Sequence, residues 1–282
     1  MFRGDATISN GEFSFTTVLP KDISYNPASA KITLYAQKND STIDASGANI
    51  ELLIGNSSTS PITDNTPPEI QLYLGDTSFI EGHVVNPSTL LIAKLNDDYG
   101  INTSSNQVGH SITYTLDDGL PIVLNKFYSA KKDDFTEGWI YYNLPTLSNG
   151  THNLSITAWD TSNNSNTTYL SFYVSEDGQI IISDLSNYPN PMRELTNFTF
   201  AHNLAGEDIE VTLEIISTSG QQIYQQSRSY ISAPTVINDW YWDGRNFSGG
   251  KLNNGIYLYG INVRSKRSNL AQKQYSRLFI TN

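Results

Sequence analysis

Acidic and amide side chains occur in three short loops of the chain. Asp64-Asn65 precedes Pro67-Pro68, Asp97-Asp98 follows an apolar run, and Asp160 is followed by Asn163-Asn164. Calcium takes about six to eight oxygen ligands from carboxylates, amides and carbonyls, so such loops at one pole of a β-sandwich would suit a calcium-stiffened junction of the cadherin type. The full cadherin spacing is absent, and turns capped by Asp and Asn are the simpler interpretation. We therefore assign no metal ligand from the sequence and keep calcium as the alternative.

Four closely spaced acid pairs raise the question of glycoside hydrolysis: Asp97-Asp98, Asp117-Asp118, Asp133-Asp134, and Asp208 with Glu210. That reaction needs two carboxyl groups that face one cleft. Adjacent residues on a strand point to opposite faces of the sheet, so neighbouring acids make poor catalytic pairs. Turns and solvated loops explain these pairs more simply.

The sequence also lacks the residues that other kinds of catalytic site need. The chain has no cysteine, which excludes thiolate nucleophiles and cysteine-ligated metals. It has no Gly-x-Ser-x-Gly elbow and no glycine-rich phosphate loop, and its four histidines are scattered without a His-x-x-x-His pair (His83, His110, His152 and His202). We assign no catalytic and no cofactor-binding residue, and we expect that this chain is not an enzyme.

Composition and charge favour a β-rich protein that does not bind nucleic acid. Of 282 residues, 38% are hydrophobic and 16% charged, with 17 Tyr, 11 Phe and 4 Trp, which is too aromatic for a disordered chain. The net charge of −11 arises in residues 1–178, which carry 8 basic against 20 acidic side chains. The last 22 residues carry five basic side chains and no acidic one, which is less than a phosphate-tracking face needs and suits a solvated edge strand. No apolar run is long enough to span a bilayer as a helix.

Alternation of apolar and polar residues predicts strands nearly everywhere. It is clear in Phe13–Val18, Lys31–Tyr35 and Asn153–Trp159, and tight-turn dipeptides such as Asn10-Gly11 and Asn149-Gly150 separate such runs. No segment has a convincing helical period. Many short strands between frequent turns predict an all-β chain of tandem immunoglobulin-like antiparallel β-sandwiches.

Two stretches predict domain boundaries. Gly55–Pro68 is nearly free of apolar residues and contains three prolines, and a second break falls at Ser175–Gly178. The resulting units are a partial β domain at 1–62, a sandwich at 63–178 and a C-terminal sandwich at 179–282. The first has too few strands for its own core, so we interpret it as the tail of an upstream immunoglobulin-like or other β domain, or as a unit that leans on a neighbour.

The inward side of each apolar run gives the expected cores. For the middle sandwich the core residues are Ile70, Leu72, Leu74, Leu90, Ile92, Leu95, Ile112, Tyr114, Leu116, Trp139, Tyr141, Leu154, Ile156, Trp159, Phe172 and Val174. For the C-terminal sandwich they are Phe198, Phe200, Val211, Leu213, Ile215, Ile223, Trp240, Trp242, Ile256, Tyr257, Tyr259, Ile261 and Phe279. Burial of such side chains stabilises each sandwich by roughly 1.5–3 kcal/mol per residue before the loss of chain entropy is counted.

The C-terminal unit carries a specific motif set. It opens with Tyr188-Pro189-Asn190-Pro191-Met192, and it closes with Trp242-Asp243-Gly244-Arg245 and Asn254-Gly255-Ile256-Tyr257. This resembles the flagellar-hook-cap-type immunoglobulin-like domain at the C-termini of many Bacteroidetes surface proteins, including cargo of the type IX secretion system. The prolines pin the opening strand, and the glycines permit the turns.

A wider resemblance covers essentially the whole chain. Asn10–Phe15, Asp97–Asn102, Gly109–Ile112, Asn149–Leu154 and Ala158–Asp160 are similar to the region that follows the peptidase domain in the type IX secretion sortase family, which belongs to the gingipain-type (C25) peptidases. The resemblance implies that the parent protein is a cysteine peptidase or transpeptidase. Its Cys–His dyad is absent here, so no catalytic residue is carried over.

The resemblance also implies a location and partners. The parent would be exported to the outer face of the outer membrane, remove C-terminal signals from cargo and attach the cargo to lipopolysaccharide. This chain would be its spacer and anchor, docking to a PorV-like outer-membrane barrel protein and to other components of the attachment complex. A strand edge at Ile256–Val263 or Tyr275–Ile280 and the basic tail would provide the contact.

A second interpretation stays open. The chain would then be the C-terminal part of a secreted adhesin or carbohydrate-active surface protein that bears the same signal domain. Trp139, Tyr141 and Tyr142 offer aromatic rings for a sugar platform, although alternation places neighbours on opposite faces and favours a core role for Trp139. A third possibility, an independent hydrolase, has no supporting residues.

Overall fold

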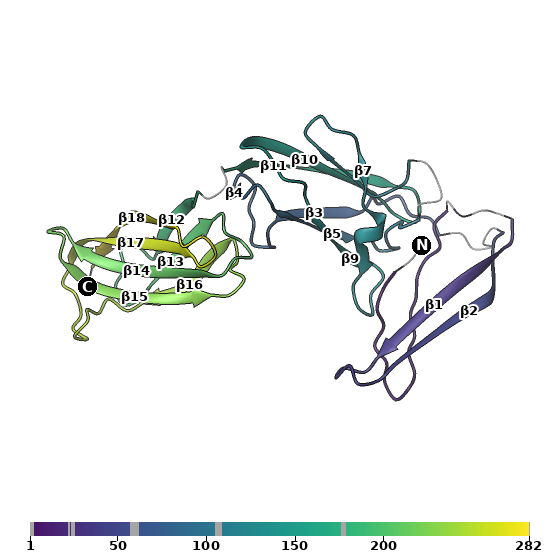
Figure 1. The fold of residues 1–282 in the computed structure, drawn as a ribbon, viewed down its shortest axis with the longest axis horizontal. Coiled ribbons are helices and arrows are strands. Elements are labelled where there is room, and N and C mark those ends of the chain that lie inside the picture. Colours follow the sequence, from purple (N-terminus) through teal and green to yellow (C-terminus); the bar gives the residue numbers. More distant parts are fainter. Residues whose placement is uncertain are drawn as a thin grey trace.

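The computed structural model describes residues 3–21, 23, 26–56, 62–104, 109–175 and 179–281. Apart from one short 3₁₀ turn, the described elements are all strands, and none of these residues forms a helix of the length and apolarity needed to cross a membrane. Three β units follow one another along the chain (Figure 1). Parts of both predicted linkers, residues 57–61 and 176–178, fall outside the described residues.

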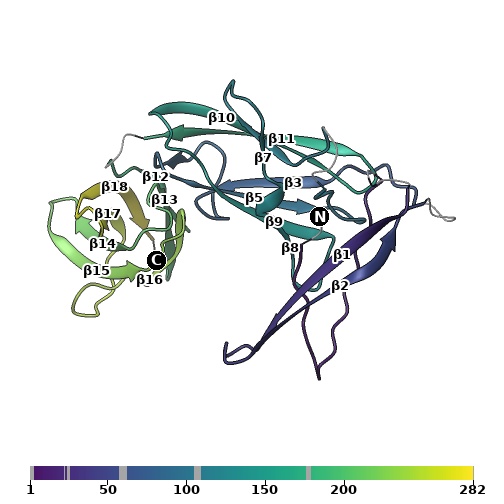
Figure 2. The same cartoon turned by 45° about the vertical axis from the view of Figure 1, so that its right-hand side comes forward.

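The first unit is a two-stranded antiparallel sheet of β1 (Ala28–Gln37) and β2 (Asp44–Ile54). It extends away from the rest of the molecule (Figure 2), and no residue of either strand is buried. The residues before it run beside β8 of the second unit, where the backbone N–H of Ala130 donates to the Arg3 carbonyl at 3.1 Å. The described residues of this segment therefore form no buried core of their own.

The second unit is a sandwich of two sheets, ordered β4-β11-β10-β6-β7 and β3-β5-β9-β8. Its elements are β3 (Glu69–Leu74), β4 (Val84–Val85), β5 (Leu90–Asn96), β6 (Thr113–Leu116), β7 (Ile122–Val123), the 3₁₀ turn η1 (Asn125–Phe127), β8 (Tyr128–Ala130), β9 (Glu137–Asn143), β10 (Gly150–Trp159) and β11 (Ser165–Val174). All strand pairs are antiparallel except β4 with β11. One apolar core runs from Ile70 to Val174 between the sheets.

The third unit is a seven-stranded immunoglobulin-like sandwich. Its strands are β12 (Ile182–Tyr188), β13 (Thr196–His202), β14 (Ile209–Ser217), β15 (Gln222–Tyr230), β16 (Val236–Trp242), β17 (Gly255–Ser265) and β18 (Ala271–Ile280). The sheets are ordered β12-β13-β16 and β15-β14-β17-β18. A second, separate core lies between them and contains fully buried Phe198, Trp240 and Tyr259.

Three predicted core residues are exposed. Tyr141 is 54% exposed, Ile256 52% and Phe279 37%. Each stands beside another apolar residue that takes the inward position: Ile140 is fully buried, and so is Leu278. Where consecutive residues are all apolar, alternation does not fix which of them faces the core. The other predicted core residues are buried or partly buried.

One predicted edge is also wrong. Ile256–Val263 lies within β17, which pairs with β14 on one side and β18 on the other, so it has no free edge. The edge strands of this sheet are β15 and β18, and β18 contains the second predicted segment, Tyr275–Ile280. Strand order within a sheet is a non-local property, and a hydrophobic pattern does not encode it.

Polar contacts join the two sandwiches. The Asp76 carboxylate accepts hydrogen bonds from both the backbone N–H and the hydroxyl of Thr235. From the other side, the buried Asn203 amide donates to Asn86 Oδ1 at 3.0 Å and to Ser175 Oγ at 2.9 Å. A cleft of about 510 Å³ opens beside these contacts. The sandwiches are thus fixed to one another by buried hydrogen bonds rather than by a shared apolar core.

Candidate functional sites

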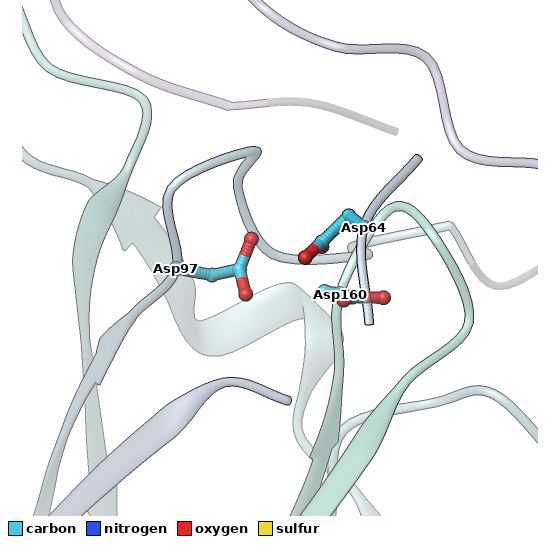
Figure 3. A group of neighbouring side chains, drawn as sticks. All are labelled: Asp64, Asp97 and Asp160. Carbon is cyan, nitrogen blue, oxygen red and sulfur yellow. The ribbon is translucent and has the colours of Figure 1, made fainter. Parts of the chain in front are cut away.

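Three aspartates from separate loops meet at one pole of the middle sandwich. Asp64 precedes β3, Asp97 follows β5 and Asp160 follows β10, so the strand ends bring all three to the same place. One carboxylate oxygen of each lies within 4.8 Å of those of the others. Figure 3 shows the carboxyl groups of Asp64 and Asp97 turned toward one another, with Asp160 beside them. We call these three residues the acidic cluster.

Hydrogen bonds from the local backbone hold Asp160 in place. Its Oδ1 accepts the backbone N–H groups of Ser162 at 2.8 Å and Asn164 at 2.7 Å, and its Oδ2 accepts the Asn164 amide at 2.6 Å. The same amide also donates to the Asp64 carbonyl at 3.2 Å. Asn164 therefore ties the Asp64 segment to the Asp160 loop.

Burial and mutual repulsion act on these carboxyl groups. Asp160 is fully buried, and Asp97 is 6% exposed. Burial, helped by the charges of Asp160 and Asp64, raises the pKa of Asp97 to about 6, although a hydrogen bond from Tyr99 opposes the shift. Burial also raises the pKa of Asp160, and contact with Asp64 adds to the rise against the hydrogen bonds from Asn164. The carboxyl groups of the acidic cluster therefore lie in a buried environment that disfavours their ionised form.

The sequence pointed to these three loops, and the structure brings part of that set together. Asp64, Asp97 and Asp160 converge, whereas Asn65 and Asp98 are exposed. Asn163 adopts a left-handed φ of 72°, and its buried Oδ1 has no hydrogen-bond partner. Lys21 was missed: its backbone N–H donates to the Thr161 carbonyl at 2.9 Å and its ammonium to the Ser162 carbonyl at 3.2 Å. A single lysine 141 residues away gives no sequence signal for that contact.

The histidines occupy separate structural positions. His152 contacts the Asp117 carboxylate at 2.8 Å, and His83 contacts Asp184 at 3.0 Å. His110 packs against Trp159 with ring centroids 4.2 Å apart and an interplanar angle of 35°, and His202 lies buried near the sandwich junction. Asp133 and Asp134 each accept hydrogen bonds from threonines. These contacts are those of turns and strand connections.

The C-terminal motif set converges on the last strand. The amide of Asn190 donates to the Arg277 carbonyl at 3.0 Å, and its Oδ1 accepts the Phe279 N–H at 2.9 Å. Met192 continues the contact as a parallel bridge to Ile280: its N–H donates to the Phe279 carbonyl and its carbonyl accepts the Thr281 N–H. We call Asn190–Met192 the clamp.

The other motif residues support this clamp. Met192 is fully buried, and a Cβ at Gly244 would lie 3.2 Å from its terminal methyl group. Gly244 has a φ of 77°, which favours glycine, and the indole N–H of Trp242 donates to the Arg245 carbonyl at 3.0 Å. Residues separated by more than fifty positions in the sequence thus build one unit that covers the end of β18.

Replacing Asn190 by alanine should loosen this end of the sheet. The substitution removes three hydrogen bonds, to Asn187, Arg277 and Phe279. At about 0.5–1.5 kcal/mol each, we expect a loss of about 2–4 kcal/mol in the free energy of unfolding of the C-terminal sandwich. Urea denaturation measures it. The matched control is Asn253→Ala, at an exposed position without a left-handed φ, which should change the midpoint little; equal effects would contradict the clamp's role.

An aromatic pair lies on the outer face of the middle sandwich. The rings of Trp139 and Tyr141 are nearly parallel, with centroids 6.3 Å apart and an interplanar angle of 17°. Trp139 is only half-buried, and the Lys94 ammonium lies over its ring at 5.6 Å. The prediction of a core role for Trp139 is therefore wrong, because residues two apart on a strand share one face and Tyr141 faces solvent.

Comparison with known proteins gives relatives only among solved structures. No protein-family model matches the chain, and no curated protein sequence matches it. The structure of dimeric latent PorU from Porphyromonas gingivalis is 30% identical over 95% of this chain, with a TM-score of 0.42. The chain spans about a quarter of the length of that PorU chain, of which 25% is covered.

Two further structures are more distant. PorZ, described as an essential surface component of the type IX secretion system of Porphyromonas gingivalis, is 20% identical over 48% of this chain and 15% of its own, with a TM-score of 0.21. Fibronectin(III)-like modules of CbhA from Clostridium thermocellum are 10% identical over 76% of this chain and 94% of theirs, with a TM-score of 0.29. All these TM-scores lie below 0.5, so the likenesses do not by themselves assign a function.

Proposed function

We propose that this chain is a non-catalytic, C-terminal β region of a type IX secretion sortase of the PorU kind. It acts as a spacer and as an anchor at the outer face of the outer membrane, and its terminal sandwich docks to a PorV-like barrel protein. The parent protein would be a cysteine peptidase that removes cargo signals and attaches cargo to lipopolysaccharide. The chain itself has no cysteine and so supplies no thiolate to that reaction.

The convergence of the C-terminal motifs on β18 carries this proposal. Tyr188–Met192, Trp242–Arg245 and Asn254–Tyr257 carry the resemblance of the C-terminal unit to the hook-cap-type domain of type IX secretion proteins, and they form the clamp or its supports. They therefore act as one structural unit that presents the terminal strand. The 30% sequence identity with PorU, which extends over nearly the whole chain, is in keeping with the same assignment.

The clamp also shows which part of β18 is open to a partner. Phe279 directs its N–H and carbonyl away from β17, to Asn190 and Met192. Along a strand, successive residues direct their backbone N–H and carbonyl groups to opposite sides. The pairing of β18 with β17 has no register shift, so Lys273 and Tyr275, like Phe279, direct their N–H and carbonyl groups away from β17. The clamp covers Arg277 and Phe279, so the open edge is Ala271–Ser276, with exposed basic and aromatic side chains.

Docking through this edge predicts the effect of a proline at Lys273. Proline there removes an outward N–H while keeping the bonds to β17, and edge strands tolerate it. We expect Lys273→Pro to weaken binding of the full chain to a PorV-like barrel protein at least about tenfold, in a pull-down or by surface plasmon resonance. Lys273→Ala is the matched control, because it removes the same ion pair with Glu214 but keeps the N–H.

The two variants separate the backbone from the side chain. Retained binding by the alanine variant and lost binding by the proline variant, both folded by circular dichroism, would support edge docking. Equal binding by both variants would contradict it.

The stacked Trp139–Tyr141 pair favours a second candidate, a carbohydrate-binding module of a secreted surface protein. Two nearly parallel aromatic rings, exposed Tyr141 and half-buried Trp139, suit contact with a sugar face. Mass spectrometry of the mature protein separates the two candidates: a secreted cargo protein would lose its terminal domain, and the sortase would retain residues 179–282.

A further inference from the structure

The acidic cluster contains a buried carboxylate oxygen that no donor among the described residues satisfies. Oδ2 of Asp64 is fully buried and has no hydrogen-bond partner. Asp97 is 6% exposed, and its Oδ1 accepts a hydrogen bond from the Tyr99 N–H at 2.8 Å. The carboxyl groups of Asp64 and Asp97 are turned toward one another (Figure 3). An ionised carboxylate only accepts, so a buried oxygen of this kind needs a cation or a proton.

Within the described residues, no Lys, Arg or His side chain supplies that positive charge. None of the ion pairs in the described part of the chain involves Asp64, Asp97 or Asp160. The nearest lysine contact of the Asp160 loop, from Lys21, goes to a backbone carbonyl instead. Three close acids, two of them buried, thus face one another without a compensating side chain.

The ligand atoms indicate which ion fits. The cluster offers carboxylate oxygens and no sulfur or imidazole, and the Asp160 loop holds a further buried acceptor, Asn163 Oδ1, that has no partner. Sites whose ligand atoms are all oxygens suit hard cations such as calcium and magnesium. Calcium accepts about six to eight such ligands at irregular geometry from flexible loops, whereas magnesium needs a near-ideal octahedron and keeps most of its waters.

We propose that the acidic cluster is a calcium site that fixes the first unit to the pole of the middle sandwich. The Asp160 loop holds Lys21 through the Thr161 and Ser162 carbonyls, and Asp64 lies on the connection that leads from β2 to β3. An ion shared by Asp64, Asp97 and Asp160 therefore stiffens two of the connections between the first unit and the sandwich, the Lys21 contact and the segment that leads into β3. The spacer is rigid with calcium bound and hinged without it.

Thermal unfolding of the full chain tests the proposal, with EDTA, millimolar calcium or millimolar magnesium present. We expect calcium at about a hundredfold excess over its Kd to raise the melting temperature of the middle sandwich by about 5–15 °C, and magnesium to raise it much less. Asp97→Asn should abolish the calcium response. In EDTA it should melt no lower than the unmodified chain, because it removes like-charge repulsion.

Asp98→Asn is the matched control, an exposed neighbour that should leave the calcium response intact. Asp64→Asn provides a second cluster variant if Asp97→Asn fails to fold. An unchanged melting temperature in calcium, an equal response to magnesium, or a calcium response that survives in a folded cluster variant would each overturn the proposal. The site is independent of barrel docking, so either proposal can fail while the other stands.

Discussion

Replacing Trp240 by alanine is expected to cost the C-terminal sandwich about 3–5 kcal/mol of unfolding free energy. Trp240 is fully buried at the centre of the second core, opposite Phe198 in the strand register, and the Arg228 guanidinium lies over its ring at 4.5 Å. Its removal leaves a large cavity between two sheets that have few ways to collapse. Urea denaturation followed by circular dichroism measures the loss.

Two variants calibrate this expectation. Tyr241→Ala changes the next residue, which is 56% exposed on the opposite face, and should cost less than about 1 kcal/mol. Trp240→Phe should cost only about 1–2 kcal/mol, because the buried indole N–H has no hydrogen-bond partner and phenylalanine removes that unsatisfied donor. If the alanine variants at 240 and 241 unfolded at the same urea concentration, the assignment of the core would be wrong.

Acidification should destabilise the C-terminal sandwich through His202. Burial lowers the pKa of His202 to about 4, against a small opposing effect of Asp76 across the junction. Because the unfolded chain binds this proton near pH 6.5, stability is complete above that pH and declines as pH falls toward 4. From the two pKa values we expect a loss of about 2 kcal/mol between pH 7.5 and pH 5.

His202→Asn isolates this contribution. The asparagine does not titrate, and its side-chain oxygen can replace Nδ1 as the acceptor for the Leu204 N–H, now made at 3.1 Å. The difference in unfolding free energy between the two pH values should therefore shrink by about 2 kcal/mol in the variant. His152 has a raised pKa and acts in the opposite direction in both proteins, so it cancels in the comparison. An identical pH dependence of the two proteins would show that His202 is accessible to protons in the folded state.

The sequence predicts the class of fold and most of each core for a simple physical reason. Strands that are half-buried alternate, and in β14 the inward residues Val211, Leu213 and Ile215 are all fully buried. The Asn10-Gly11 turn also forms as its dipeptide predicts, with positive φ at both residues and a bridge between Ser9 and Glu12. The domain boundaries at 62 and 178 remain predictions.

What the pattern could not predict is non-local. Tyr141 and Phe279 lie in runs where adjacent residues are both apolar, and only the sheet register decides between them. The central position of β17 depends on strand order. For the acidic cluster, the sequence shows that each aspartate lies just before or after a predicted strand. The convergence and burial of Asp97 and Asp160 depend on which strand ends lie together at one end of the sandwich, and the sequence pattern does not encode this.

Binding of the purified full chain to a purified PorV-like outer-membrane barrel protein tests the central claim most directly. Size-exclusion chromatography in detergent should show the two proteins eluting together, and the Lys273→Pro variant should elute apart from the barrel while the Lys273→Ala variant stays with it. Separate elution of the unmodified chain at micromolar concentrations of both proteins would contradict the account of this chain as a surface anchor.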